Sequence, residues 1–116
     1  MAAEKLGAAR VLIEAGYYGS AVSEAYYVMF DAAKAILIGK NILRHKHGAV
    51  IAAFGEHFAK PGLVPYELHQ WIIAAEKDRL IADYSVEDDP DISIARRHIE
   101  RAETFLERIS SLLEND

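Results

Sequence analysis

One long apolar stretch constrains the fold of this chain more than any other feature. Residues 20–38 contain no glycine or proline. Apolar residues follow one another there at spacings of three and four, the period of one helix face: Val22, Tyr26, Met29, Ala33 and Ile36. A second apolar row widens this face: Ala25, Phe30 and Leu37. We therefore expect a helix that is buried against several neighbours at the centre of a bundle.

A serine at one end and a glycine at the other predict where this central helix starts and stops. Ser20 suits an N-cap position, because its hydroxyl can accept a hydrogen bond from a free backbone N–H. Gly39 stands where a helix C′ residue is expected. Tyr26 and Tyr27 lie mid-helix and are predicted to pack in the core. Because a buried tyrosine hydroxyl needs a partner, both are also candidate binding residues.

The remaining periodicity predicts four further helices. The first covers residues 3–15 and ends at Gly16, and a polar loop over 40–46 follows the central helix. The next covers 47–60, where Pro61 and Gly62 end it. A long helix then runs from Pro65, which is tolerated in a first turn, to about Tyr84.

An acidic turn over residues 85–90 leads to the last helix, which Asp91 or Ser93 is expected to cap. The apolar residues of this helix predict one buried stripe: Ile94, Ile99, Ala102, Phe105, Leu106, Ile109, Leu112 and Leu113. No segment has the alternation of a strand. The predicted fold class is all-α, an up-and-down bundle of four to five helices.

Bulk composition limits the class of protein. A chain of 116 residues suits one domain with one core, so we assign residues 1–116 to a single domain. Its 52% hydrophobic and 27% charged residues are typical of a globular protein. No apolar run approaches the roughly 20 residues of a membrane span, and the N-terminus lacks the order of a signal peptide. Since cysteine is absent as well, we place the chain in the cytoplasm, away from membranes.

Charge is unevenly distributed along the chain. The net charge of −5 argues against a general nucleic-acid coat protein. Residues 32–55 nevertheless contain no acid, and several basic residues fall there: Lys34, Lys40, Arg44, His45, Lys46 and His47. This segment is either a local phosphate-binding patch or a solvated loop.

The five histidines do not have the spacing of a metal site. His45 and His47 lie in or next to the predicted loop, and the other three fall on separate helices. No HExxH motif occurs and cysteine is absent, so we predict no metal. Ser20 and Ser23 also lack a histidine or acid at the spacing of a nucleophilic site, and no GxSxG motif occurs.

A charged group on the long helix is the best candidate site. Glu76, Arg79 and Asp83 are spaced three and four residues apart and can share one helix face. Ala75 and Ala82 flank that face with small side chains, which leaves room above Arg79. An arginine held by carboxylates is oriented for bidentate contact with phosphate. The alternative is a salt-bridge cluster that only stabilises the helix.

Three segments, in order, resemble one protein family. Residues 23–35 (SEAYYVMFDAAKA) resemble the signature S-x-AYYAMF-x-AA-x-A and depart from it at Val28. Residues 47–58 (HGAVIAAFGEHF) are similar to HKGVI-x-x-F-x-x-x-F and depart from it at Gly48 and Ala49. Residues 79–84 (RLIADY) match R-x-x-ADY. Together, from about residue 8 to about residue 113, they resemble the short stand-alone prokaryotic HEPN domain (higher eukaryotes and prokaryotes nucleotide-binding).

The resemblance implies a helical bundle that forms a homodimer and pairs with a small nucleotidyltransferase, often as a toxin–antitoxin module. It also implies that many members are endoribonucleases that need neither metal nor cofactor. These use an Arg-x4–6-His motif that both protomers bring to the dimer cleft. Here Arg79 matches the arginine, but Tyr84 stands in the histidine position and the next histidine is His98. A tyrosine with the ordinary pKa of about 10 is a poor base at pH 7.

Three functions therefore remain open. In the first, the chain is the toxin-like partner of a nucleotidyltransferase and binds nucleotide, RNA or the partner through Arg79, Asp83 and Tyr84, with Glu76 beside them. Tyr84 could then be an acceptor of an adenylyl group, as the resemblance implies for some paired members. In the second, the chain cleaves RNA with Arg79 on the phosphate and either Tyr84 or His47 as base. In the third, it is a helical interaction domain without catalysis.

Overall fold

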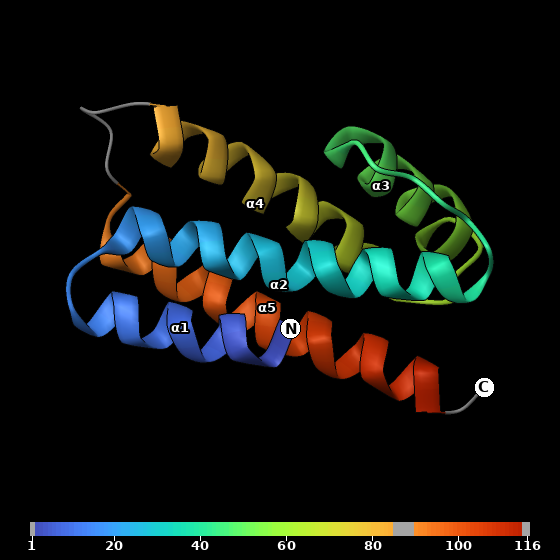
Figure 1. The fold of residues 1–116 in the computed structure, drawn as a ribbon, viewed down its shortest axis with the longest axis horizontal. Coiled ribbons are helices and arrows are strands. Elements are labelled where there is room, and N and C mark those ends of the chain that lie inside the picture. Colours follow the sequence, from blue (N-terminus) through green and yellow to red (C-terminus); the bar gives the residue numbers. More distant parts are fainter. Residues whose placement is uncertain (1, 85–89, 115–116) are drawn as a thin grey trace.

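The computed structural model of this protein describes residues 2–84 and 90–114. Its elements are α1 (Ala2–Glu14), α2 (Tyr18–Gly39), α3 (His47–Phe54), the π-helical turn η1 (Gly55–Ala59), α4 (Tyr66–Tyr84) and α5 (Ile92–Glu114). They pack as a helical bundle (Figure 1), and the described residues contain no strand. The predicted all-α class is confirmed. None of the described helices is both long and apolar enough to cross a membrane.

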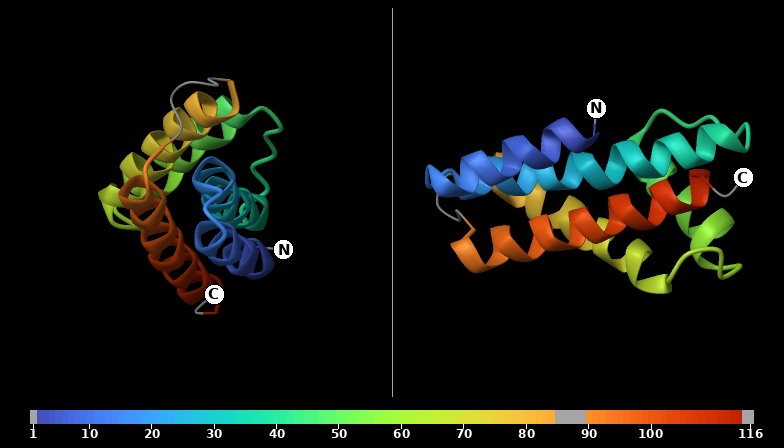
Figure 2. Two further views of the ribbon diagram at one scale, coloured as in Figure 1. Left: turned by 90° about the vertical axis from the view of Figure 1, so that its left-hand side faces the viewer. Right: turned by 90° about the horizontal axis from the view of Figure 1, so that it is seen from below.

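The helix α2 is the centre of the bundle, as its broad apolar face predicts. It contacts α1, α3, α4 and α5. In Figure 1 it lies between α4 on one side and α1 and α5 on the other, and Figure 2 shows that α1 runs antiparallel to both α2 and α5. Both of its predicted apolar rows are buried: Val22, Ala25, Tyr26, Met29, Phe30, Ala33, Ile36 and Leu37. Burial on this scale is the main favourable contribution to folding.

Three of the helical segments end in the same way, with a left-handed residue just after the last turn. Gly16, Asn41 and Gly62 have φ angles of 85°, 60° and 83°. At each of them the next amide bonds a carbonyl five residues back, as from Ile42 to Leu37 (2.9 Å), which is the Schellman pattern. Gly16 and Gly62 were predicted as stops.

The predicted ends of α2 were both wrong. Gly39 is the last helical residue, and Asn41, whose side chain tolerates the left-handed region, takes the C′ position instead. At the other end α2 begins at Tyr18, so Ser20 lies inside the first turn, and no side chain caps the helix. The first hydrogen bond of the helix runs from the Ala21 N–H to the Tyr17 carbonyl at 3.0 Å, so Tyr17 and not Ser20 is the N-cap residue.

The predicted helix over residues 47–60 is present but changes register at Gly55, where α3 passes into η1. A Cβ atom added at Gly55 would lie 2.4 Å from His69 Nε2 on α4. Glycine therefore lets the imidazole of α4 approach the backbone of η1 more closely than any other residue would. The π-helical turn then brings Phe58 into the core, where it stacks on Phe54 with 6.0 Å between ring centroids.

The last helix follows its predicted stripe in part, since Ile94, Leu106 and Leu112 are half-buried. Ile99, Ala102, Phe105 and Ile109 are buried, but Leu113, predicted to be buried, is 46% exposed. The helix α1 begins only partway along α5 (Figure 2), so it does not cover the final turn of α5. Most of the predicted acidic turn, residues 85–89, lies outside the described part of the chain.

Asp91 caps α5, as one of the two predicted alternatives. Its Oδ1 accepts hydrogen bonds from the Ser93 hydroxyl at 2.6 Å and from the Ile94 amide at 3.0 Å. These bonds hold the pKa of Asp91 below its ordinary value, because they stabilise the charged carboxylate.

We expect Asp91→Ala to lower the free energy of unfolding at pH 7. Because the pKa of folded Asp91 is lowered, its charge stabilises the fold above the ordinary pKa of about 3.9, and this contribution is lost as the pH falls through the lower folded value. Urea unfolding at pH 7 and pH 3 should therefore show a smaller difference between wild type and Asp91→Ala at pH 3. Asp91→Asn, which keeps a capping oxygen, is the control. An equal difference at both pH values would contradict the charged cap.

Candidate functional site

Three helices bring six of the predicted site residues together beside α2. Tyr26 and Tyr27 come from α2, His47 begins α3, and the charged residues come from α4: Glu76, Arg79 and Asp83. We call these six residues the arginine cluster. The cluster forms because the i, i+3 and i+4 spacing on α4 faces the tyrosine pair on α2.

Arg79 is the ionic centre of the cluster. Its Nη2 lies 3.0 Å from Glu76 Oε1 and its Nη1 lies 3.1 Å from Asp83 Oδ2. The Arg79 side chain is only 10% exposed. A buried guanidinium of this kind is stable in the fold only because both carboxylates balance its charge and accept its hydrogen bonds.

The space above Arg79 is filled, contrary to the expectation from Ala75 and Ala82. The guanidinium carbon lies 4.9 Å from the ring centroid of Tyr26 and 5.6 Å from that of Tyr27, within cation–π range. The small side chains on α4 let α2 approach closely. The tyrosine rings of α2 therefore fill the space above Arg79 that the sequence analysis had predicted for a ligand. Within one protomer Arg79 is thus an enclosed ion-pair centre.

His47 joins the cluster through the same partners. Its Nδ1 lies 2.9 Å from the Tyr26 hydroxyl and 3.7 Å from Glu76 Oε2. Its ring stacks on Phe30, with 4.4 Å between centroids, and its side chain is 36% exposed. His47 is therefore the half-exposed titratable group that rests on the buried part of the cluster.

The pKa values of the buried members keep the phenol neutral and the carboxylate charged. Burial, and after it the Glu76 carboxylate, raises the pKa of Tyr26 well above its ordinary value. Burial alone would raise the pKa of Glu76, but the Tyr26 hydroxyl and the Arg79 guanidinium outweigh it, so this pKa lies below its ordinary value. Burial would likewise lower the pKa of Arg79, and Glu76 reverses the direction. At neutral pH the cluster therefore holds an ionised Glu76–Arg79 pair beside an un-ionised Tyr26.

Two contributors were missed from the sequence. The Ser23 hydroxyl donates to Asp83 Oδ1 at 2.9 Å, so α2 orients the second carboxylate as well. Phe30 supplies the ring on which His47 stacks. Ser23, Tyr27 and Phe30 are four and three residues apart, so a helix-face analysis of α2 could have found them. The contact between His47 and Glu76 joins two helices, and no sequence spacing indicates it.

Tyr84, predicted as a catalytic residue, is not brought into the cluster. It is 81% exposed at the end of α4. His98, the next histidine after Arg79, is buried between helices, where its Nε2 pairs with Asp78 Oδ2 at 2.6 Å. Among the described residues no three histidine or acidic side chains are grouped to hold a metal ion.

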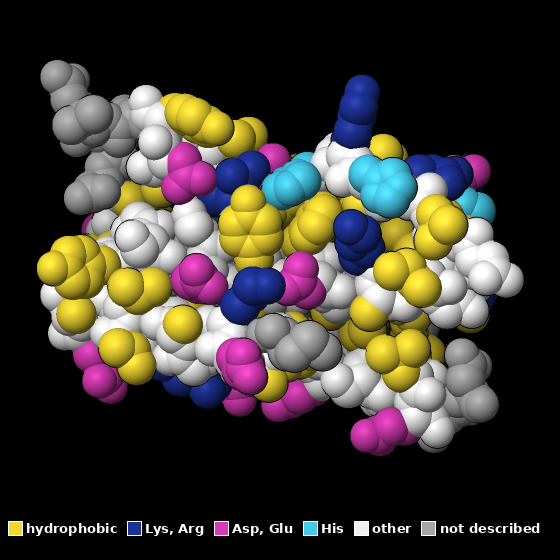
Figure 3. Space-filling view, in the orientation of Figure 1, with side chains coloured by type: hydrophobic (Ala, Val, Ile, Leu, Met, Phe, Trp, Pro, Cys, Tyr) yellow, Lys and Arg dark blue, Asp and Glu magenta, His cyan; other side chains and the backbone are white. Residues whose placement is uncertain are grey.

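Three exposed basic residues directly precede His47 in the chain: Arg44, His45 and Lys46. In Figure 3 the dark blue and cyan side chains gather on the part of the face that α3 and the loop before it occupy. The acid-free segment predicted from the sequence therefore lies next to the arginine cluster.

We expect Glu76→Gln to destabilise the fold by about 3 kcal/mol, because it leaves the buried Arg79 charge with Asp83 alone. Urea unfolding at pH 7 measures the change. Glu56→Gln is the matched control, since the Glu56 side chain is 73% exposed. The Glu56→Gln substitution should change the free energy of unfolding by less than about 0.5 kcal/mol. Similar losses for the two variants would contradict the ion-pair centre.

The difference between wild type and Glu76→Gln also has a pH dependence with a defined sign. Because the pKa of folded Glu76 is lowered, its stabilising charge is present above the ordinary value of about 4.3 and is lost as the pH falls through the folded value. The stability difference should therefore shrink below pH 4.

Comparison with known proteins places the chain in one family. The HEPN domain model matches residues 1–113. A UPF0332 protein of Gloeobacter violaceus is 39% identical over 83 residues, which cover 72% of this chain and 66% of that protein. Two proteins of Methanocaldococcus jannaschii named "Putative toxin" are 38% identical over 97% of this chain and 84% of theirs, and 35% identical over 85% and 65%. The resemblance inferred from the sequence is confirmed, and the chain belongs to the HEPN domain family.

Proposed function

We propose that this chain is a toxin-like HEPN protein whose arginine cluster cleaves RNA, with His47 as the base. One observation carries the proposal: His47 and Arg79 rest on the same Tyr26 ring and on the same Glu76 carboxylate. A half-exposed imidazole thus stands beside a fixed positive charge, although no histidine follows Arg79 in the motif spacing. The names of the relatives support the toxin-like part.

The hydrogen bonds of the cluster can prepare His47 as a base. Tyr26 stays protonated, so its hydroxyl can donate to Glu76 while it accepts from His47 Nδ1–H. His47 Nε2 then carries the lone pair, and no hydrogen bond or ion pair to another described residue engages it. Glu76 stabilises the imidazolium that forms when Nε2 takes a proton.

The reaction that fits this arrangement needs no metal. His47 Nε2 removes the proton of a ribose 2′-hydroxyl, and the 2′-oxygen attacks the adjacent phosphorus. The bond from phosphorus to the 5′-oxygen breaks, an imidazolium returns a proton to that oxygen, and a 2′,3′-cyclic phosphate remains. Arg44 and Lys46 beside His47 would hold the RNA phosphates, and Arg79 would keep Glu76 ionised and in place.

A second copy of the chain would supply the second imidazole and close the site. The outer face of α4 supports a homodimer, because it exposes large apolar side chains at helical spacing. These residues are Ile73 (48%), Leu80 (39%), Ile81 (40%) and Tyr84 (81%). Arg79 is adjacent to Leu80 on this helix. A dimer through α4 would therefore bring two arginine clusters to one cleft.

We expect purified wild-type protein to cleave a structured RNA in the presence of EDTA and to leave 2′,3′-cyclic ends, which gel analysis and mass spectrometry detect. His47→Ala should reduce cleavage at least about 100-fold, because a general base contributes about that much. Tyr26→Phe, which keeps the ring but loses the hydroxyl, should reduce it less. His57→Ala is the matched control, since this half-exposed histidine lies on η1, outside the cluster.

Folding and assembly are measured on the same samples. Circular dichroism reports whether each variant is folded, and light scattering reports whether it is dimeric. Leu80→Glu should be folded, monomeric and inactive. Wild-type protein that is folded and dimeric but leaves RNA intact would overturn the ribonuclease, and so would full activity in His47→Ala.

A second candidate function rests on Tyr84. Its phenol is 81% exposed, and its neighbour Asp83 belongs to the arginine cluster. A nucleotidyltransferase partner could therefore reach Tyr84 and attach a nucleotide next to the cluster. The phenol oxygen would attack the α-phosphorus of a nucleoside triphosphate, and pyrophosphate would leave. In this case the chain is the modified member of a two-protein module.

We expect a nucleotidyltransferase encoded beside this chain to add AMP from ATP to wild-type protein but not to Tyr84→Phe. Mass spectrometry of the peptide that contains Tyr84 measures the added nucleotide. Tyr66→Phe is the matched control, because Tyr66 is also exposed and lies at the other end of α4. Modification that persists in Tyr84→Phe would contradict this assignment and leave the ribonuclease proposal untouched.

A further inference from the structure

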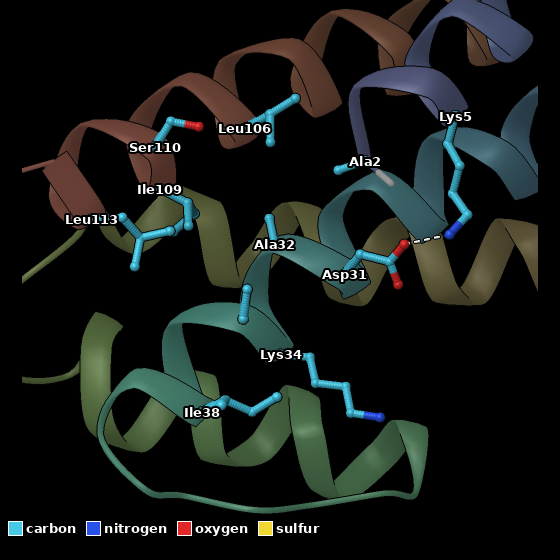
Figure 4. A pocket seen from close by; sticks show the side chains of 11 residues that line it. Ala2, Lys5, Asp31, Ala32, Lys34, Ile38, Leu106, Ile109, Ser110 and Leu113 are labelled. Atoms are coloured by element: carbon cyan, nitrogen blue, oxygen red, sulfur yellow. Dashed lines mark hydrogen bonds and ion pairs between the residues drawn. The ribbon is translucent and has the colours of Figure 1, made fainter.

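An apolar groove lies on the opposite side of α2 from α4, where α1 stops short of its neighbours. Its volume is about 390 Å³, within the range of small-molecule sites. Aliphatic side chains of α2 and α5 form its walls (Figure 4): Ala32, Ala35, Ile38, Leu106, Ile109 and Leu113. We call this site the α2–α5 groove. It shares no residue with the arginine cluster.

The groove is open because α1 is short. α1 has 13 residues, whereas α2 has 22 and α5 has 23. Lys5 of α1 pairs with Asp31 of α2, so α1 reaches only the middle of α2. Beyond that point α1 no longer covers this side of α2 and α5, and Ile38 and Leu113 are 49% and 46% exposed. Two exposed aliphatic side chains that face one another across a groove favour the binding of an apolar group between them.

The edge of the groove carries an excess positive charge. Lys5, Asp31 and Lys34 are the charged residues that line it. Lys5 neutralises Asp31, and no hydrogen bond or ion pair to a described residue engages Lys34. In Figure 4 the Lys34 side chain extends from α2 away from the α5 side chains that form the opposite wall. A ligand that complements this surface has an apolar chain and one anionic end.

We propose that the α2–α5 groove binds a free single-chain aliphatic carboxylate, with its alkyl chain against α2 and α5 and its carboxylate on Lys34. The wall from Leu106 to Leu113 lies on α5. It spans about two helical turns, roughly 11 Å, which suits a medium-length alkyl chain. A protein partner matches the groove less well. A stable protein interface covers about 800 Å² on each side, which is far more than the walls of one groove of about 390 Å³ provide. The proposal is independent of RNA cleavage.

The first test is calorimetric titration with octanoate, decanoate and dodecanoate below their micelle concentrations. Affinity should rise about fourfold for each added CH₂ until the groove is full. Lys34→Gln should weaken decanoate binding about two- to fivefold and leave decanol binding unchanged, because only the carboxylate meets the lysine. Lys60→Gln, which removes an exposed lysine outside the groove, should leave the binding of both ligands unchanged.

The second test fills the groove. Ala35 is an exposed wall residue, so Ala35→Phe should occupy the groove without disturbing the core and should abolish decanoate binding. Ala8→Phe is the matched control, because Ala8 is an exposed helical alanine of α1 that does not line the groove. Circular dichroism checks that both variants are folded.

The outcomes separate the other possible occupants. Absence of decanoate binding to folded wild-type protein would overturn the proposal, as would binding that Ala35→Phe leaves intact. Light scattering that shows a dimer lost in Ala35→Phe but kept in Ala8→Phe would assign the groove to a second copy instead. Sedimentation with anionic vesicles, but no binding of the free carboxylate, would assign it to a membrane surface.

Discussion

Burial of the Arg79 guanidinium beside the central helix dictates the arrangement of the polar residues around it. A buried charge requires balancing carboxylates, and Glu76 and Asp83 provide them at 3.0 Å and 3.1 Å. Each carboxylate is in turn tied to another element, Asp83 to Ser23 on α2 and Glu76 to the Tyr26–His47 pair on α2 and α3. One arginine thus links α4 to α2, and its partner Glu76 also contacts the first residue of α3.

Local features of the sequence predicted most of the fold. The 3.6-residue period predicted the buried faces of α2 and α5, and Gly16 and Gly62 predicted where two helical segments end. Helix periodicity and helix ends could be predicted because both depend on residues close together in the chain. The errors have physical causes too. Gly39 and Asn41 both suit a left-handed turn, and Leu113 is apolar but has no helix over it. The π-helical turn lies where Gly55 meets His69 of α4, a contact that only the folded chain provides.

The candidate site was predictable only within single helices. Glu76, Arg79 and Asp83 follow from i, i+3 and i+4 spacing on α4. Their enclosure by Tyr26 and Tyr27, and the approach of His47, depend on how α2, α3 and α4 cross. For the same reason the sequence left both Tyr84 and His47 open as the base in place of the missing histidine, and only the fold brings His47 to the cluster. The cluster joins ion pairs that stabilise the bundle to a half-exposed imidazole at its edge.

The close contact between Gly55 and His69 implies a rule for sequence change among related chains. The imidazole occupies the volume that a Cβ atom at position 55 would need, 2.4 Å from Nε2, so the two positions share one space. A chain that acquires alanine or serine at position 55 gains helix propensity but must move or shorten the side chain at position 69. Substitutions at these positions should therefore occur in pairs across the family. Their co-variation would mark which relatives retain the π-helical turn and which have a straight α-helix there.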